Sequence, residues 1–188
     1  MSALPICHRG FRHRGFSLIE VLVALIIIGV GMLGIAKIQA LSYASTGTAA
    51  QRSIAAILAS SMSSAMRANR AYWSVQAATA QQTITITNGA LAPAPTDAAL
   101  TSTASCLGTS CIPQALAAYD LHQWATALTA IGALPNSTAT INCYPPAATN
   151  YPVSCTILVQ WSERNIGLNA QSQGTTMLGP DYTLYVEP

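Results

Sequence analysis

The chain has 188 residues, of which 51% are hydrophobic and only 7% are charged, whereas soluble globular domains average about 25% charged residues. The net charge of +2 hides an asymmetry, because beyond Ala71 a single basic residue, Arg164, faces five acidic ones. Nucleic-acid-binding proteins gather lysine and arginine on one face, so the composition argues against nucleic acid as a partner of the C-terminal part.

An apolar run from Phe16 to Ala36 follows a short basic leader. A helix of about 20 apolar residues crosses a bilayer, so the run predicts one transmembrane helix. Arginines lie ahead of the run and none lies directly after it, which predicts a cytoplasmic N-terminus.

Two plainer interpretations of this run are a secretory signal and a simple membrane anchor. A cleaved signal has an apolar core of about 7–15 residues and then a small-residue cleavage site, whereas this run is longer and continues into Lys37. A simple anchor accounts for the length but not for Glu20, because a carboxylate at the bilayer centre costs about 2.5–3.5 kcal/mol.

The stretch GFSLIE at residues 15–20 resembles the processing signature of type IV prepilins, a family that includes pilins and type II secretion pseudopilins. The resemblance implies that a prepilin peptidase removes residues 1–15 by cutting after Gly15 and then N-methylates Phe16. It also implies that residues 16–36 form the membrane and assembly helix, which inserts first into the lipid bilayer and later into a fibre.

Glu20 would be the fifth residue of the processed chain, where this family places a glutamate. The new amino group of Phe16 on a neighbouring subunit could pair with the Glu20 carboxylate and set the axial register of assembly. A buried ion pair adds little net stability. The pair would therefore act mainly through specificity, because a subunit in the wrong register would leave a charge unpaired.

Residues 37–70 continue in a helical pattern that becomes amphipathic, and the resemblance makes them the second half of a spine helix ending near Asn69. At 100° per residue one apolar face predicts packing on a globular head; it holds Ile54, Ile57, Leu58, Met62 and Ala65. Arg52, Arg67 and Arg70 lie on another face, which either meets solvent or contacts neighbouring subunits.

Residues 71–188 are expected to form the head. Alternating residues predict strands at 83–87, 139–144, 153–161 and 182–186, and Pro113 predicts the start of a helix that ends near Gly132. Its apolar stripe is expected to be core: Ala117, Leu121, Trp124, Leu128 and Ile131. The stretch 91–105 is predicted to be an exposed loop of low complexity. The fold class is therefore α+β, a long N-terminal helix packed on a small antiparallel sheet.

Four cysteines in the head, Cys106, Cys111, Cys143 and Cys155, indicate an oxidising compartment and up to two disulfides. Among three possible pairings we favour 106–111 and 143–155, with free buried thiols as the alternative. We expect no metal site, because no C-x-x-C pair occurs and only His122 could assist.

We expect neither a cofactor nor a catalytic site. His122 is the only histidine after Gly15, and Asp120, two residues earlier, lies on a different face of the predicted helix. The chain is thus expected to be a substrate of the prepilin peptidase and no enzyme itself.

Shorter stretches, at residues 20–34, 65–73, 120–135 and 156–165, resemble PilV-type minor pilins. That resemblance implies a type IV pilus subunit that primes assembly, rides at the fibre tip and supports twitching motility and adhesion. Its partners would be other minor pilins, the major pilin and the inner-membrane assembly platform, with the head periplasmic before assembly and at the cell surface afterwards. A minor pseudopilin of type II secretion and a tip adhesin or DNA-uptake pilin are the alternatives.

Overall fold

The structure is a computed structural model that describes residues 15–91, 95–130, 134–146, 151–164, 176–177 and 179–188. The chain divides into two compact units, residues 1–43 and 44–188. The predicted leader, apart from Gly15, lies outside the described residues.

The first unit contains the beginning of α1 (Leu18–Ala68), a helix of 51 residues. No proline occurs between Ile6 and Ala92, so nothing removes a backbone donor or forces a kink along this length. The backbone carbonyl of Ser17 accepts from the N–H groups of Glu20 (3.0 Å) and Val21 (3.2 Å) and thereby starts the helix.

In the second unit, the remainder of α1 packs into the core of the head through Ala55, Ala59, Met62 and Met66, none more than 1% exposed. The predicted face was wrong for Ile57, whose side chain is 66% exposed. The buried stripe is centred on Ala55 and Ala59, whose small side chains contribute little to a hydrophobic pattern.

Helix α1 ends at Ala68, and a second helix, α2 (Arg70–Thr79), follows after Asn69. Asn69 has φ −112° and ψ 51°, which interrupts the helical geometry. Its side-chain amide donates to the carbonyl of Pro113 at 2.7 Å. The sequence did not indicate α2, which buries Tyr72 and Trp73 in the core.

The sheet of the head has five strands in the order β2-β1-β3-β4-β7, each pair antiparallel. The strands are β1 (Gln82–Thr87), β2 (Ala90–Leu91), β3 (Thr138–Tyr144), β4 (Ser154–Gln160) and β7 (Asp181–Val186). A separate two-stranded ribbon joins β5 (Glu163–Arg164) to β6 (Thr176–Met177). Four of the strands, β1, β3, β4 and β7, were predicted, whereas the two-residue strands carry too little pattern to be seen.

The two faces of the sheet differ as alternation requires. The register aligns Ile84, Ile141, Ile157 and Leu184 across four strands, and the three isoleucines are no more than 1% exposed. The intervening positions of β1 and the first half of β3 are threonines, partly or fully exposed. One face is therefore core and the other is a polar, almost uncharged surface.

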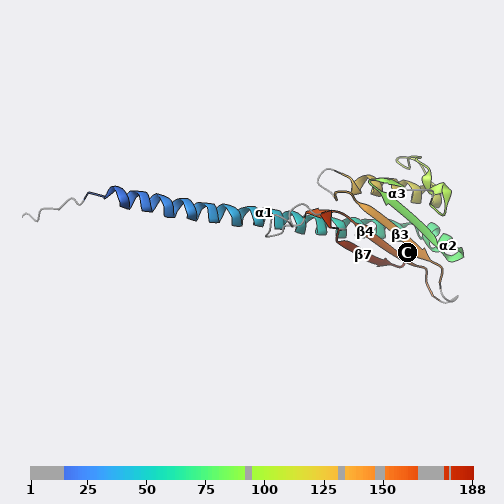
Figure 1. Cartoon of the computed structure of the whole chain (residues 1–188). Coiled ribbons are helices and arrows are strands. Elements are labelled where there is room, and N and C mark those ends of the chain that lie inside the picture. Colours follow the sequence, from blue (N-terminus) through green and yellow to red (C-terminus); the bar gives the residue numbers. More distant parts are fainter. Residues whose placement is uncertain (1–14, 92–94, 131–133, 147–150, 165–175, 178) are drawn as a thin grey trace, which may run out of the picture. The chain divides into compact units, whose positions relative to one another are not determined.

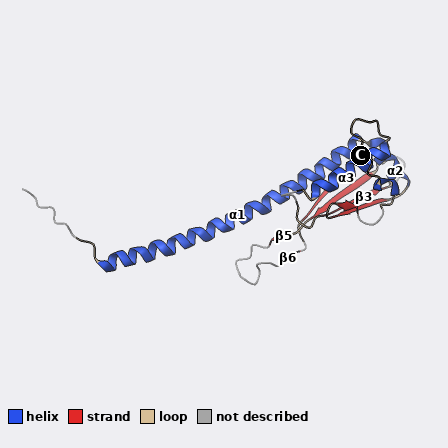
Figure 2. Ribbon diagram, turned by 90° about the horizontal axis from the view of Figure 1, so that it is seen from above, coloured by secondary structure: helices blue, strands red, loops and turns tan. Residues whose placement is uncertain are grey.

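Helix α3 (Pro113–Leu128) covers the same face of the sheet as α1 (Figures 1 and 2). Its predicted stripe is buried as expected at Ala117, Leu121, Trp124 and Leu128; Ile131 and Gly132 lie outside the described residues. The indole N–H of Trp124 donates to the carbonyl of Leu58 at 2.8 Å, which joins α3 to α1. The predicted α+β class is confirmed.

The stretch 91–105 is not simply an exposed loop, as was predicted. A short 3-10 helix, η1 (Ala98–Thr101), places Leu100 in the core with 0% exposure. Asp97 caps this helix by accepting from the N–H of Ala99 at 3.0 Å, and Thr96 accepts from the N–H of Thr83 on β1 at 3.2 Å. The segment thus covers part of the β1 edge that the short strand β2 leaves open.

Candidate functional site

The peptide bond between Gly15 and Phe16 lies ahead of α1 in non-helical backbone. Phe16 is 83% exposed, and a Cβ built on Gly15 would meet no atom within 4 Å. A peptidase needs access to backbone outside a helix, and this bond lies two residues before α1 begins at Leu18.

Glu20 lies in the first turn of α1, where a carboxylate interacts favourably with the helix dipole by about 0.3–1 kcal/mol. Its side chain is exposed. Among the described residues the ion pair found joins Arg52 and Glu163, so Glu20 has no ion-pair partner within that part of the chain. The carboxylate is therefore available to a group from another molecule.

The residues around Glu20 have no protein cover in this chain. The large apolar side chains between Phe16 and Ile38 are all about half exposed or more. Helix α1 contains an 18-residue window of mean hydropathy 2.7, none of it buried, and is long and apolar enough to cross a membrane. A surface of this kind suits contact with lipid or with the apolar face of another helix.

The sequence profile of the prokaryotic N-terminal methylation motif matches residues 10–36, which include Gly15, Phe16 and Glu20. Within this segment the chain resembles type IV prepilins and pseudopilins. No curated protein and no solved structure matches the chain. The motif implies processing by prepilin peptidase and assembly with pilus components, and the apolar helix is consistent with a membrane anchor.

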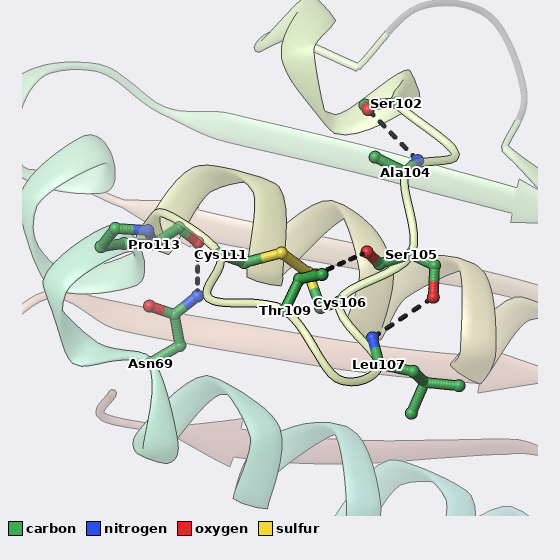
Figure 3. Close-up of a disulfide and its surroundings, with 9 residues drawn as sticks. All are labelled: Asn69, Ser102, Ala104, Ser105, Cys106, Leu107, Thr109, Cys111 and Pro113. Atoms are coloured by element: carbon green, nitrogen blue, oxygen red, sulfur yellow. Dashed lines mark hydrogen bonds between the residues drawn. A yellow bond between two sulfur atoms is a disulfide. The ribbon is translucent and has the colours of Figure 1, made fainter.

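The head holds two disulfides, Cys106–Cys111 and Cys143–Cys155, which is the pairing favoured from the sequence. Cys143 and Cys155 are directly opposite each other on β3 and β4 and at most 1% exposed. The first disulfide instead closes a surface loop just before α3 (Figure 3). Free thiols at these four positions are thereby excluded in this structure.

The short disulfide loop is held by its own side chains. The N–H of Leu107 donates to the hydroxyl of Ser105 at 3.2 Å, and the hydroxyl of Thr109 donates to the carbonyl of Ser105 at 3.4 Å (Figure 3). The loop leads into α3, whose first residue, Pro113, accepts from Asn69. The disulfide loop therefore lies beside the junction between α1 and α2.

A partly buried network joins α2, η1 and α3. The Asp97 carboxylate accepts from the hydroxyl of Tyr72 at 2.8 Å and from the amide of Gln114 at 2.9 Å. Burial, reinforced by the neighbouring Asp97, raises the pKa of Tyr72. Burial alone would raise the pKa of Asp97 too, but its hydrogen bonds from Gln114, the Ala99 N–H and Tyr72 together lower it. The network fixes the three helices relative to one another.

Arg52 on α1, one of the three arginines predicted to meet solvent or a neighbouring subunit, forms an ion pair within the chain while its side chain stays 62% exposed. Its Nε and Nη2 donate to the two carboxylate oxygens of Glu163, each at 3.1 Å. The indole N–H of Trp161 donates to the same carboxylate at 3.2 Å. Arg67 and Arg70, by contrast, are exposed and form no ion pair with the described residues.

The polar residues of α3 show no arrangement typical of a catalytic or metal site. Nε2 of His122 is buried without a hydrogen-bond partner among the described residues, and burial raises the pKa of Asp120. Within the part of the chain that the structure describes, no three His, Cys, Asp or Glu side chains are grouped as metal ligands.

Sequence reasoning did not find the roles of Asp97 and Glu163. An N-cap signal was present, because Asp97 precedes a short helix and aspartate is favoured at that position. The Arg52–Glu163 pair spans 111 residues, and no local pattern could have indicated it.

Proposed function

We propose that this chain is a minor pilin of a type IV pilus, similar to PilV-type subunits, that helps to initiate assembly and takes a place in the tip complex. The observation that carries the proposal is the methylation motif at residues 10–36 with Glu20 five positions beyond Gly15. Short resemblances at residues 65–73 and 120–135 support the minor-pilin assignment. Twitching motility and adhesion would then depend on the subunit indirectly.

The mechanism follows from charge in a low-dielectric environment. Cleavage after Gly15 creates a positive amino group on Phe16, ahead of the first turn of α1. The Glu20 carboxylate of an adjacent subunit is exposed and has no ion-pair partner among the described residues, so it can accept this group. A subunit out of register would leave a carboxylate in hydrocarbon at a cost of about 2.5–3.5 kcal/mol.

The proposed route begins in the inner membrane, with the N-terminus cytoplasmic and the head periplasmic, and ends in the fibre. Two disulfides in the head support an oxidising compartment. In this role the chain is non-enzymatic, and it reaches the fibre through the assembly platform together with other minor pilins and the major pilin.

The test compares Glu20→Ala with Glu187→Ala, a control that removes an exposed carboxylate from the head. Both variants should be cleaved, and mass spectrometry of each should find N-methylated phenylalanine at the start. Glu20→Ala should reach the membrane but be depleted from sheared fibres by at least about ten-fold, since 1.4 kcal/mol corresponds to a factor of ten.

Equal incorporation of both variants would refute the register mechanism. An unprocessed N-terminus in the wild-type chain would refute the assignment as a pilin. A strain without the chain that keeps its pili but loses secretion of folded proteins would identify a pseudopilin instead.

A further inference from the structure

A shallow groove lies between α1 and α3 in the head, with a volume of about 270 Å³. The apolar part of its lining includes Met62 and Ala65 from α1 and Trp124 and Ala127 from α3. Asp120 is the one carboxylate among its described lining residues. The groove therefore combines apolar walls with a single negative charge.

The Asp120 carboxylate is partly buried but has no hydrogen bond or ion pair with the described residues. The other head carboxylates on which the fold depends are satisfied, because Asp97 accepts from three donors and Glu163 binds Arg52. Burial without a partner disfavours the charged form and raises the pKa of Asp120. A cation that entered the groove would remove this cost.

The size and shape of the groove select the kind of cation. A helix is about 10–12 Å across and would not enter a space of about 270 Å³. A lysine or arginine side chain fits, since its aliphatic stem can lie along apolar walls while its charged head reaches a polar group. A bare inorganic cation would leave the walls exposed.

The described part of the chain does not supply this cation. Arg52 is engaged by Glu163, and neither Arg67 nor Arg70 forms an ion pair there. The sequence beyond Ala71 contains one basic residue against five acidic ones, but residues 44–71 of the same unit add three arginines, so attraction of a cation to the groove depends on Asp120 itself. The cation should therefore come from another molecule.

We propose that the groove between α1 and α3 receives a lysine or arginine side chain of a neighbouring pilin-type subunit, with Asp120 binding its charged end. The proposal rests on the assembly role proposed above. It adds a contact between heads to the contact between N-terminal helices, and it identifies Asp120 as a residue that selects the partner.

The first experiment tests the chemistry of the groove on the processed full-length chain in neutral detergent micelles. N-acetyl-lysine amide is titrated while the indole N–H resonance of Trp124 is followed by NMR, and N-acetyl-norleucine amide serves as the uncharged probe of similar stem. The lysine probe should give a saturable shift with an affinity at least about five-fold higher, as expected for an ion pair worth about 1 kcal/mol.

Matched variants separate the groove from general attraction to the other carboxylates of the head. Asp120→Asn should reduce the preference for the lysine probe to near one, whereas Asp181→Asn, which removes an exposed carboxylate on β7, should leave it unchanged. Equal binding of the two probes, or a preference that survives Asp120→Asn, would overturn the proposal.

The second experiment identifies the source of the cation in cells. A photoreactive amino acid in place of Gln123, an exposed residue of the groove, should cross-link to another subunit with an N-terminal methylation motif, within one helical turn of a lysine or arginine. Asp120→Lys should reduce the adduct at least about five-fold, and changing the mapped base to glutamate should restore it. Asp181→Lys should have no effect.

The two experiments fail in distinguishable ways. Binding of the lysine probe without any adduct, in a chain that still enters sheared fibres, would refute a neighbouring subunit as the source of the cation. Absence of the wild-type chain from the fibres would instead refute the assembly role. An adduct that is unaffected by Asp120→Lys would refute the role of Asp120 while leaving assembly intact.

Discussion

Removal of the Cys143–Cys155 disulfide is expected to destabilise the head more than removal of Cys106–Cys111. The first links residues 12 apart in sequence and the second residues 5 apart. By the loop-entropy relation these cross-links restrict the unfolded chain by about 3 and about 2 kcal/mol respectively. Cys143 and Cys155 are also at most 1% exposed, so their replacement adds a packing loss that the surface loop does not incur.

The measurement is urea unfolding of the processed full-length protein in a mild neutral detergent, followed by tryptophan fluorescence. Trp73, Trp124 and Trp161 are all at most 5% exposed and belong to the head, so the signal reports its unfolding. The double variants Cys143→Ala/Cys155→Ala and Cys106→Ala/Cys111→Ala are compared with the wild type, with the slope against urea checked for constancy.

The free energy of unfolding of the first double variant should lie below that of the second by at least about 1 kcal/mol. Each double variant is the other's control, because both remove two cysteines from the same unit of the protein. A loss that is equal in the two variants, or greater for the surface loop, would refute the reasoning from loop length and burial.

Two further predictions concern the segment before the disulfide loop and its network. Leu100→Ala should lower the free energy of unfolding by about 2–5 kcal/mol, whereas Leu107→Ala, at a side chain 75% exposed, should change it by less than about 0.5 kcal/mol; similar losses would show that η1 is not part of the core. The pKa of Asp97 is lowered and that of Tyr72 is raised in the folded chain. The urea midpoint should therefore fall below about pH 4, as Asp97 is protonated and its stabilisation lost, and above about pH 10, where only the unfolded chain readily ionises Tyr72. In the Tyr72→Phe variant the urea midpoint should fall less above about pH 10. A fall as large as in the wild type would contradict this assignment.

The parts of the fold that were predictable have a strong local signal. The short stretch at residues 15–20 lies within the segment that the methylation profile matches, and the strands of the sheet follow from alternation that one buried face enforces. Helix α3 was found because Pro113 suits a first helical turn and the stripe from Ala117 to Leu128 keeps a helical period. Each of these signals lies within a stretch no longer than one helix or strand.

The parts that were missed depend on tertiary contacts or on small residues. The core face of α1 is centred on Ala55 and Ala59. The predicted face followed the larger Ile57 and was therefore rotated away from the true core face. Leu100 is a single large apolar residue in a stretch rich in proline, alanine and threonine, and only its packing reveals its role. The ion pair of Arg52 with Glu163 and the position of Asp120 in its groove form only in the packed head, so neither could be predicted from the sequence.

The way α1 enters the head has a mechanical consequence. Along the helix axis α1 buries four side chains in the core: Ala55, Ala59, Met62 and Met66. The carbonyl of Leu58 accepts a hydrogen bond from the indole N–H of Trp124. A pull directed along that axis loads all of these attachments at once, in shear, and cannot peel them apart one by one. Under such a load the head would separate from this part of α1 only if these attachments failed together.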